Sequence, residues 1–167
     1  MRFFAKWHRV TLFVVSISII GALFLLLSSR DLVLDSGKKI MEKVRTDPRV
    51  EINGVVIPVE LATTTAAIEK GLSGKRSLDA ESGMLFLFKT PYRYDFWMPD
   101  MHFPIDIIWI NAGVVEGIEH DVSNEFDPKN PKLYSPKTPV QYVLEVNAGF
   151  AKAKQIEPGD SVTFLNI

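Results

Sequence analysis

The chain contains no cysteine, and this absence removes several chemistries at once. Disulfides, thiolate metal sites and thiol nucleophiles are excluded, and no lipobox cysteine is available for lipid attachment. Histidine occurs only three times. The serines of the 72–82 segment, Ser73, Ser77 and Ser82, lack the nucleophile-elbow motif, and no motif places a histidine to activate them. A serine hydrolase is therefore not expected.

Positive charge is also scarce over most of the chain. Residues 48–167 carry 11 Lys/Arg against 16 Asp/Glu, whereas residues 1–47 carry 8 against 4. A mildly acidic domain without a basic stripe repels phosphate backbones. We therefore expect no nucleic-acid partner.

Only one long apolar run is present, the eighteen uncharged residues Val10–Leu27. A helix rises about 1.5 Å per residue, so this run is close to the length that crosses a bilayer core. Basic residues precede it, and the positive-inside rule then predicts residues 1–9 in the cytoplasm. We interpret residues 10–29 as a single-pass membrane anchor that leaves the following domain periplasmic or extracellular.

A cleaved secretory signal is the alternative for this run. Such a signal has a shorter apolar core and a small-x-small cleavage site, for which Leu27, Ser28 and Ser29 are only a weak match. Both interpretations export the domain, so the membrane is the one partner that the N-terminal sequence predicts. Residues 30–48 then form a juxtamembrane stalk that ends at Pro48.

The remaining residues, 49–167, are expected to form one β domain. Asn53-Gly54 favours a tight hairpin between strands at 50–52 and 55–61, and Pro58 indicates an edge strand. A threonine run at 63–65 is a helix cap, followed by a helix over 66–70 that Gly71 ends.

Further apolar runs predict the rest of the fold. Strands are expected at 83–88, 94–98, 105–110, 114–118, 141–146 and 161–165, with a second short helix at 148–154 and a long surface loop at 121–139. About eight short strands and two short helices predict a mainly β fold, as an antiparallel sandwich, a jelly roll or a barrel.

Several ordered motifs in this domain resemble those of one family. They are Gly71-Leu72, Arg76-Ser77-Leu78, Gly83-Met84-Leu85-Phe86, Phe96-Trp97-Met98, Pro104-Ile105-Asp106-Ile107-Ile108, Val143-Leu144-Glu145 and Ala148-Gly149. Together they are similar to the domain of unknown function 192 family, over residues 50–165. The resemblance implies a small, mainly β fold, commonly exported or membrane-tethered, without an established activity or assigned catalytic residues. The sequence departs from the family pattern at Ser73 and over residues 98–101.

Asp106 and Arg76 are the first candidates for a site. Asp106 begins an otherwise apolar strand, on the same face as Ile108 and Ile110, where a carboxylate needs a partner. It is either structural, as an ion pair with Arg76 or a loop cap, or a tuned acid or base. Arg76 either clamps a ligand anion or pairs with Asp106 or Glu145.

Metal and aromatic chemistry complete the candidates. His102 and His120 with the neighbouring carboxylates match no standard ligand spacing, so we expect neither a metal nor another cofactor. The aromatic residues of the 92–109 segment suit stacking on a ligand or packing of a small β core. The candidate ligand-binding residues are Arg76, Trp97, His102, Asp106 and Glu145.

The sequence thus predicts a membrane-anchored β domain outside the cytoplasm. We expect it to be an accessory module of the cell envelope that binds a small molecule or another envelope protein, because polar residues converge beside an aromatic strand. One alternative is a hydrolase that uses Asp106 or Glu145 as general base. The other is a purely structural envelope protein.

Overall fold

The computed structural model describes residues 38, 39, 41, 42 and 46–167. The chain divides into two compact units, Met1–Thr46 and Asp47–Ile167. The predicted anchor at 10–29 and most of the predicted stalk at 30–48 lie outside the described residues. Within the part that is described, no helix combines the length and apolar character needed to cross a membrane.

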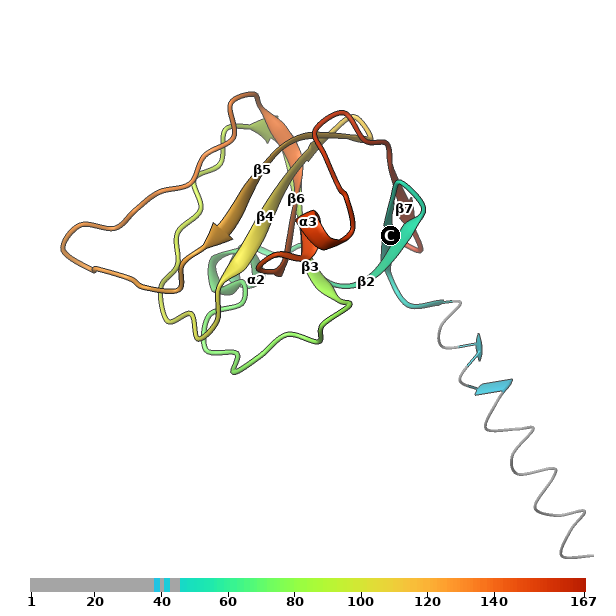
Figure 1. Ribbon diagram of the computed structural model, residues 1–167, viewed down its shortest axis with the longest axis horizontal. Helices are drawn as coiled ribbons and strands as arrows, with labels where there is room; N and C mark the ends of the chain where they lie inside the picture. Colours follow the sequence, from blue (N-terminus) through green and yellow to red (C-terminus); the bar gives the residue numbers. More distant parts are fainter. Residues whose placement is uncertain (1–37, 40, 43–45) are drawn as a thin grey trace, which may run out of the picture. The chain divides into compact units, whose positions relative to one another are not determined.

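The Asp47–Ile167 unit is built on one seven-stranded sheet (Figure 1). Its strands are β1 (Arg49–Ile52), β2 (Val55–Ala62), β3 (Gly83–Tyr92), β4 (Ile105–Asn111), β5 (Val114–Val122), β6 (Val140–Asn147) and β7 (Val162–Leu165), with helices α2 (Thr65–Lys70) and α3 (Phe150–Ala153). The strand order is β5-β4-β6-β3-β2-β1-β7. Neighbours are antiparallel except β2 and β3, which run parallel with α2 in their connection. The mainly β prediction with two short helices is confirmed.

The sheet curls into a half-barrel rather than forming two packed sheets. The start of β5 approaches the residues before β7 through an isolated bridge between Val114 and Ser161. Two backbone hydrogen bonds support this contact: Val115 N donates to Asp160 O at 3.0 Å, and Val162 N donates to Gly113 O at 2.8 Å. The two edge strands of the sheet therefore meet at one end, which shields backbone groups that an open sheet exposes.

The β1–β2 hairpin forms around Asn53-Gly54 as predicted, with φ of 50° and 81° at the two turn residues. The prediction that Pro58 marks an edge strand is wrong, because β2 lies between β1 and β3. Val59 N donates to Pro48 O on the β1 side, so the Pro58 nitrogen points to the other side. On that side the pairing with β3 begins only at Val59. The absence of an N–H at Pro58 therefore leaves no carbonyl group of β3 without its donor.

Helix α2 begins one residue before the predicted start and ends at the predicted residue. Thr64 is the N-cap, and its hydroxyl accepts a hydrogen bond from Ala67 N at 3.2 Å. Gly71 ends the helix with a φ of 49°, a conformation that glycine adopts more readily than other residues. Its N–H donates to Ala67 O at 2.9 Å. The six-residue helix therefore stops where the chain must turn into the 72–82 loop.

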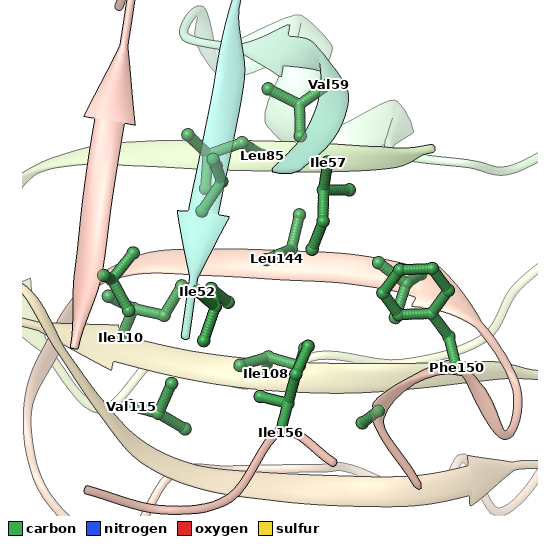
Figure 2. Close-up of a cluster of buried hydrophobic side chains, with 14 residues drawn as sticks. Ile52, Ile57, Val59, Leu85, Ile108, Ile110, Val115, Leu144, Phe150 and Ile156 are labelled. Atoms are coloured by element: carbon green, nitrogen blue, oxygen red, sulfur yellow. The ribbon is translucent and has the colours of Figure 1, made fainter. Parts of the chain in front are cut away.

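The two faces of the curled sheet bury separate hydrophobic clusters. The inner cluster, shown in Figure 2, is formed mainly by aliphatic side chains together with Phe150 and Ala151 of α3. The aromatic cluster on the other face includes Phe86, Trp109, Met98, Met101 and Tyr134, with Ile68 of α2 and Phe96 packed against it. Strand β4 contributes to both clusters, and six of its seven residues are buried. This explains its apolar character on both faces.

One predicted strand is absent from the described residues. Residues 94–98 form no strand, and only Phe96 makes an isolated bridge with Tyr134 in the long 123–139 loop. Phe96 N and Tyr134 N each donate to the other residue's carbonyl oxygen at 2.8 Å. The segment is apolar on both faces, which favoured a strand, but Phe96 and Met98 pack onto the outside of the sheet rather than extend it. The loop prediction for residues 121–139 holds from residue 123 onward.

Candidate functional site

Glu145 places a carboxyl group on the face of the sheet that carries the aromatic cluster. It lies in β6 between Met84 of β3 and Ile107 of β4 in the strand register. Its neighbours Leu144 and Val146 belong to the inner cluster. Because side chains alternate along a strand, Glu145 points to the opposite face, toward the aromatic cluster. Three central strands thus position it among apolar side chains.

The carboxyl of Glu145 is buried and unpaired. Its side chain is 6% exposed. Within residues 46–167 it has no hydrogen-bond or ion-pair partner. Burial away from water raises the pKa of this carboxyl from 4.5 to about 8, because the charged form is destabilised by desolvation. At neutral pH, Glu145 is therefore mainly protonated, with a hydroxyl to donate and a carbonyl oxygen to accept.

Glu145 lines a cavity of about 210 Å³. The other lining residues come from the end of α2 and the residues after it, from β3, and from the 94–101 segment: Ile68, Glu69, Lys70, Gly71, Leu72, Ser73, Phe86, Phe88, Tyr94, Asp95, Phe96, Trp97, Met98, Pro99 and Met101. We call this cavity the Glu145 pocket. It combines mostly apolar walls with a few polar groups, which is the usual composition of a ligand site.

Four of the five aromatic side chains of the pocket, Phe86, Phe88, Tyr94 and Phe96, are in ring contact with one another. Phe88 and Tyr94 stack with ring centroids 3.6 Å apart and an interplanar angle of 13°. Phe96 packs edge-to-face against Phe86 at 5.1 Å. Trp97 remains 52% exposed and contacts Phe126 of the long loop at 6.0 Å.

Backbone and side-chain hydrogen bonds hold the 93–101 segment over the sheet. Ser73 Oγ donates to Pro99 O at 2.8 Å, and Gly74 N donates to Asp100 O at 2.9 Å. On the other side, Arg93 Nε donates to Pro136 O at 2.9 Å. Ser73, Met98, Pro99 and Met101 of these segments line the pocket.

Asp106 has a different position and a different task. It is fully buried on the α3 side of the sheet, and its carboxylate accepts three backbone hydrogen bonds. The donors are Asp121 N at 2.9 Å, Gly149 N at 3.1 Å and Ala151 N at 2.9 Å. Asp106 thus ties β5 and the start of α3 to β4. This geometry corresponds to the structural alternative for Asp106, with backbone groups rather than Arg76 as its partners.

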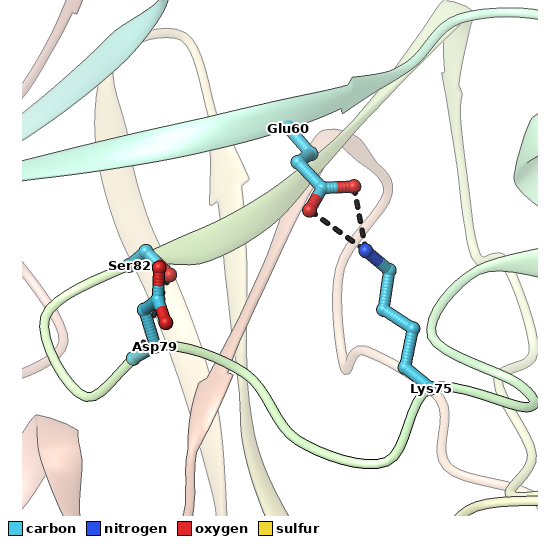
Figure 3. A network of polar contacts seen from close by, with 4 residues as sticks. All are labelled: Glu60, Lys75, Asp79 and Ser82. Carbon is cyan, nitrogen blue, oxygen red and sulfur yellow. Dashed lines mark hydrogen bonds and ion pairs between the residues drawn. The ribbon is translucent and has the colours of Figure 1, made fainter.

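Arg76 and His102 lie away from the pocket lining. Arg76 is exposed on the 72–82 loop, where the neighbouring Lys75 Nζ makes bonds of 2.7 and 2.8 Å to the Glu60 carboxylate (Figure 3). His102 is exposed, and its Nε2 lies 3.7 Å from Asp100 Oδ1. Of the five candidate residues, the structure brings together Trp97 and Glu145. Among the described residues, no group of three metal-ligating side chains is present.

Sequence reasoning missed the pocket residues from α2 and β3. Phe88 follows Phe86 by two positions in β3, and this spacing places both rings on one face of a strand. That alternation was the available signal for the aromatic wall. No signal in the sequence indicated that the C-terminal end of α2, with Glu69 and Lys70, lines the same pocket as Glu145.

Comparison with known families is consistent with this architecture. A family model named DUF192 and described as Uncharacterized ACR matches residues 48–164. The chain belongs to the DUF192 family. The match covers the whole sheet except Leu165 at the end of β7, and it includes all residues of the Glu145 pocket. The resemblance found from sequence motifs is therefore confirmed.

Two solved structures resemble this DUF192 chain. A protein of unknown function from Novosphingobium aromaticivorans DSM 12444 aligns with a TM-score of 0.62 and 33% identity, over 69% of this chain and 83% of that chain. A protein from Sinorhizobium meliloti 1021, described as a "putative transcription regulator", aligns with a TM-score of 0.63 and 28% identity, over 72% of this chain and 93% of that chain. No curated protein matches the chain.

Proposed function

We propose that this DUF192 domain binds a small molecule in the Glu145 pocket. The observation that carries the proposal is the unpaired carboxyl of Glu145 at the apolar floor of a cavity. The Glu145 oxygens are not among the fully enclosed side-chain atoms of the described residues that lack a hydrogen bond, so they open to the cavity. A ligand in the cavity can therefore supply the hydrogen-bonding partner that the described residues do not. The same group therefore provides both affinity and orientation.

The size of the pocket limits the ligand. A cavity of about 210 Å³ is smaller than the roughly 300–1,000 Å³ typical of drug-sized ligand sites. The aromatic rings offer flat apolar faces, and the floor offers a single polar group. The occupant we propose is a fragment-sized molecule with an apolar body and one polar group directed at Glu145.

Binding is favoured over hydrolysis by the surroundings of the two carboxyls named as bases. The carboxylate of Asp106 accepts hydrogen bonds from three backbone N–H groups and does not line the pocket. Glu145 has a pKa near the range that suits a general base. However, no described residue pairs with it as a second acid–base group. A single isolated carboxyl is sufficient for recognition.

We also propose that the domain acts outside the cytoplasm as an envelope accessory module. The support is the N-terminal sequence, in which basic residues precede the apolar run Val10–Leu27. The acidic excess of residues 48–167 supports a small ligand rather than nucleic acid.

A thermal-shift screen tests the binding proposal. The full-length chain is heated in the presence of a library of fragment-sized metabolites, and a ligand specific for the native state raises the melting temperature. We expect the shift to be lost in Trp97→Ala, which removes an exposed side chain of the pocket wall and leaves the core intact. Ligands that shift both proteins equally, or a broad library without a hit, would contradict the proposal.

A further inference from the structure

We propose that the ligand of the Glu145 pocket is a small organic ammonium cation, which pairs with the Glu145 carboxylate and packs against the aromatic wall. This inference rests on the proposed binding function and names the chemical class of the ligand. It follows from the charges, the rings and the depth of one carboxyl in the pocket.

The charged groups of the lining favour a cation. Three carboxyl groups line the pocket, from Glu145, Glu69 and Asp95, against the single ammonium of Lys70. Glu69 and Asp95 are exposed at the rim, whereas Glu145 is buried at the floor. An anionic ligand would meet an excess of like charge. A cation would be attracted by the exposed carboxyls of Glu69 and Asp95 as well as by Glu145, the buried one.

The aromatic wall provides the second attraction. Tyr94, Phe96, Phe88 and Trp97 all line the cavity that holds the Glu145 carboxyl. Aromatic faces attract ammonium groups through their quadrupoles, and quaternary ammonium ligands are recognised in this way. A cavity with aromatic walls and a carboxyl floor therefore suits a cation whose substituents are apolar. A metal ion fits less well, because the pocket offers few oxygen ligands.

Binding of a cation is linked to the loss of a proton from Glu145. Burial raises the pKa of this carboxyl to about 8, so at neutral pH a cation must displace the proton to form the ion pair. The other titratable groups that line the pocket are Glu69 and Lys70 of α2 and Tyr94 and Asp95 of the 93–101 segment. The neighbouring residues of β3 and β4 on this face, Met84, Phe86 and Ile107, do not titrate. Affinity for a cation should therefore rise with pH until Glu145 is ionised.

Choline and its neutral isostere 3,3-dimethylbutan-1-ol form the matched probes. They have the same shape, and the positive charge of choline does not depend on pH. Isothermal titration of the full-length chain in a maltoside detergent should give tighter binding for choline than for the alcohol. The choline affinity should rise about tenfold per pH unit below about pH 8 and then level off. The affinity for the alcohol should show no such rise.

Variants separate the ion pair from the rest of the pocket. In Glu145→Gln, the choline affinity at about pH 8 should fall at least about tenfold and lose its pH dependence, whereas that of the alcohol should stay within about twofold. Glu69→Gln is the matched control, because it removes an exposed carboxylate from the same pocket and should preserve the pH dependence. Trp97→Ala should lower the affinity for choline more than the affinity for the alcohol. Because Trp97 is exposed, the substitution should not disturb the packing of the core.

The outcomes distinguish two failures. If the alcohol binds as tightly as choline, or if Glu145→Gln binds choline with unchanged affinity, the ligand class is wrong while the pocket remains a binding site. If neither probe binds, and benzylamine and benzyl alcohol also give no heat, the cation inference is overturned. If the metabolite screen is negative as well, the proposed binding function is overturned with it.

Discussion

Glu145 and Asp106 are two carboxyls buried in adjacent strands of one sheet, and their surroundings give them different chemistry. Asp106 accepts three backbone hydrogen bonds and joins β5 and α3 to β4. Glu145 has no partner among the described residues and lies in a cavity. A carboxyl that lines a cavity and has no protein partner can meet a ligand, so Glu145 is the better indicator of a functional site.

The raised pKa of Glu145 has a consequence for stability. Between pH 4.5 and about 8 the folded protein holds a proton that the unfolded chain has released. The free energy of unfolding therefore falls as the pH rises, by up to about 1.4 kcal/mol per pH unit. Below this range both states are protonated, and above it both are ionised, so the contribution becomes constant.

Glu145→Gln should remove this dependence. We expect the variant to be more stable than the parent by about 1–3 kcal/mol at pH 7, with little difference near about pH 4.5. Urea unfolding followed by tryptophan fluorescence across this range measures the difference. Other titrating groups are common to both proteins and cancel. Parallel stability profiles for the two proteins would show that Glu145 titrates normally in the folded state.

At the scale of elements, local signals in the sequence were enough for the short-range structure. Asn53-Gly54 predicted the hairpin, and the threonine run and Gly71 predicted the two ends of α2. Both signals are local because turn and cap chemistry depend on adjacent residues. The position of Asp106 on the face of Ile108 followed from strand alternation. The partner of each face could not be predicted in this way. It depends on the register between β4 and β6, which connects residues about forty positions apart.

The same limit explains the candidate residues that the structure does not bring together. Arg76 and Asp106 were grouped because their charges are complementary, but Asp106 is satisfied by nearby backbone groups instead. Trp97 and Glu145 line one pocket because the 93–101 segment crosses the apolar face of the sheet. The bonds that place this segment come from residues before and after it, such as Ser73 and Tyr134. Such long-range contacts leave no local pattern.

Gly83 is the residue that allows β3 and β6 to approach closely below the pocket. A Cβ at this position would lie 2.7 Å from Glu145 O and 2.9 Å from Leu144 Cδ1. Gly83→Ala therefore requires a shift of the β6 backbone at Glu145. We expect it to lower the free energy of unfolding by about 1–3 kcal/mol, the usual cost of overpacking a core.

A second strand glycine provides the control for this substitution. The nearest atom to a Cβ at Gly117 of β5 is Trp109 Cδ1, at an ordinary contact distance of 3.5 Å. Gly117→Ala should change stability by less than about 0.5 kcal/mol, as for a substitution without a special mechanism. Chemical denaturation of both variants gives the comparison. Equal effects at the two positions would mean that the close approach at Gly83 does not limit the fold.

For the whole molecule, the half-barrel explains how a small sheet can hold a site without a second sheet. Its curvature gives one face to the inner cluster and the other to the aromatic cluster, and its edges meet at Val114 and Ser161. The sequence predicted a mainly β domain, but it did not distinguish a curled single sheet from a sandwich. That distinction depends on long-range contacts such as the bridge between Val114 and Ser161, which neither segment encodes by itself.

The proposed location of this domain is tested by topology reporters at the C-terminus. Val10–Leu27 is uncharged and follows Arg2, Lys6 and Arg9. We therefore expect the C-terminus to lie outside the cytoplasm. In a bacterial host, a C-terminal alkaline phosphatase should be active, because its disulfides form outside the cytoplasm, and a green fluorescent protein should be dark. Replacement of the three basic residues by glutamate should reduce phosphatase activity.

An N-terminal tag that stays with the membrane fraction at full molecular mass indicates an anchor, whereas its loss indicates cleavage. A fluorescent cytoplasmic fusion without phosphatase activity would contradict export, and the ligand of the Glu145 pocket would then be sought among cytoplasmic amines.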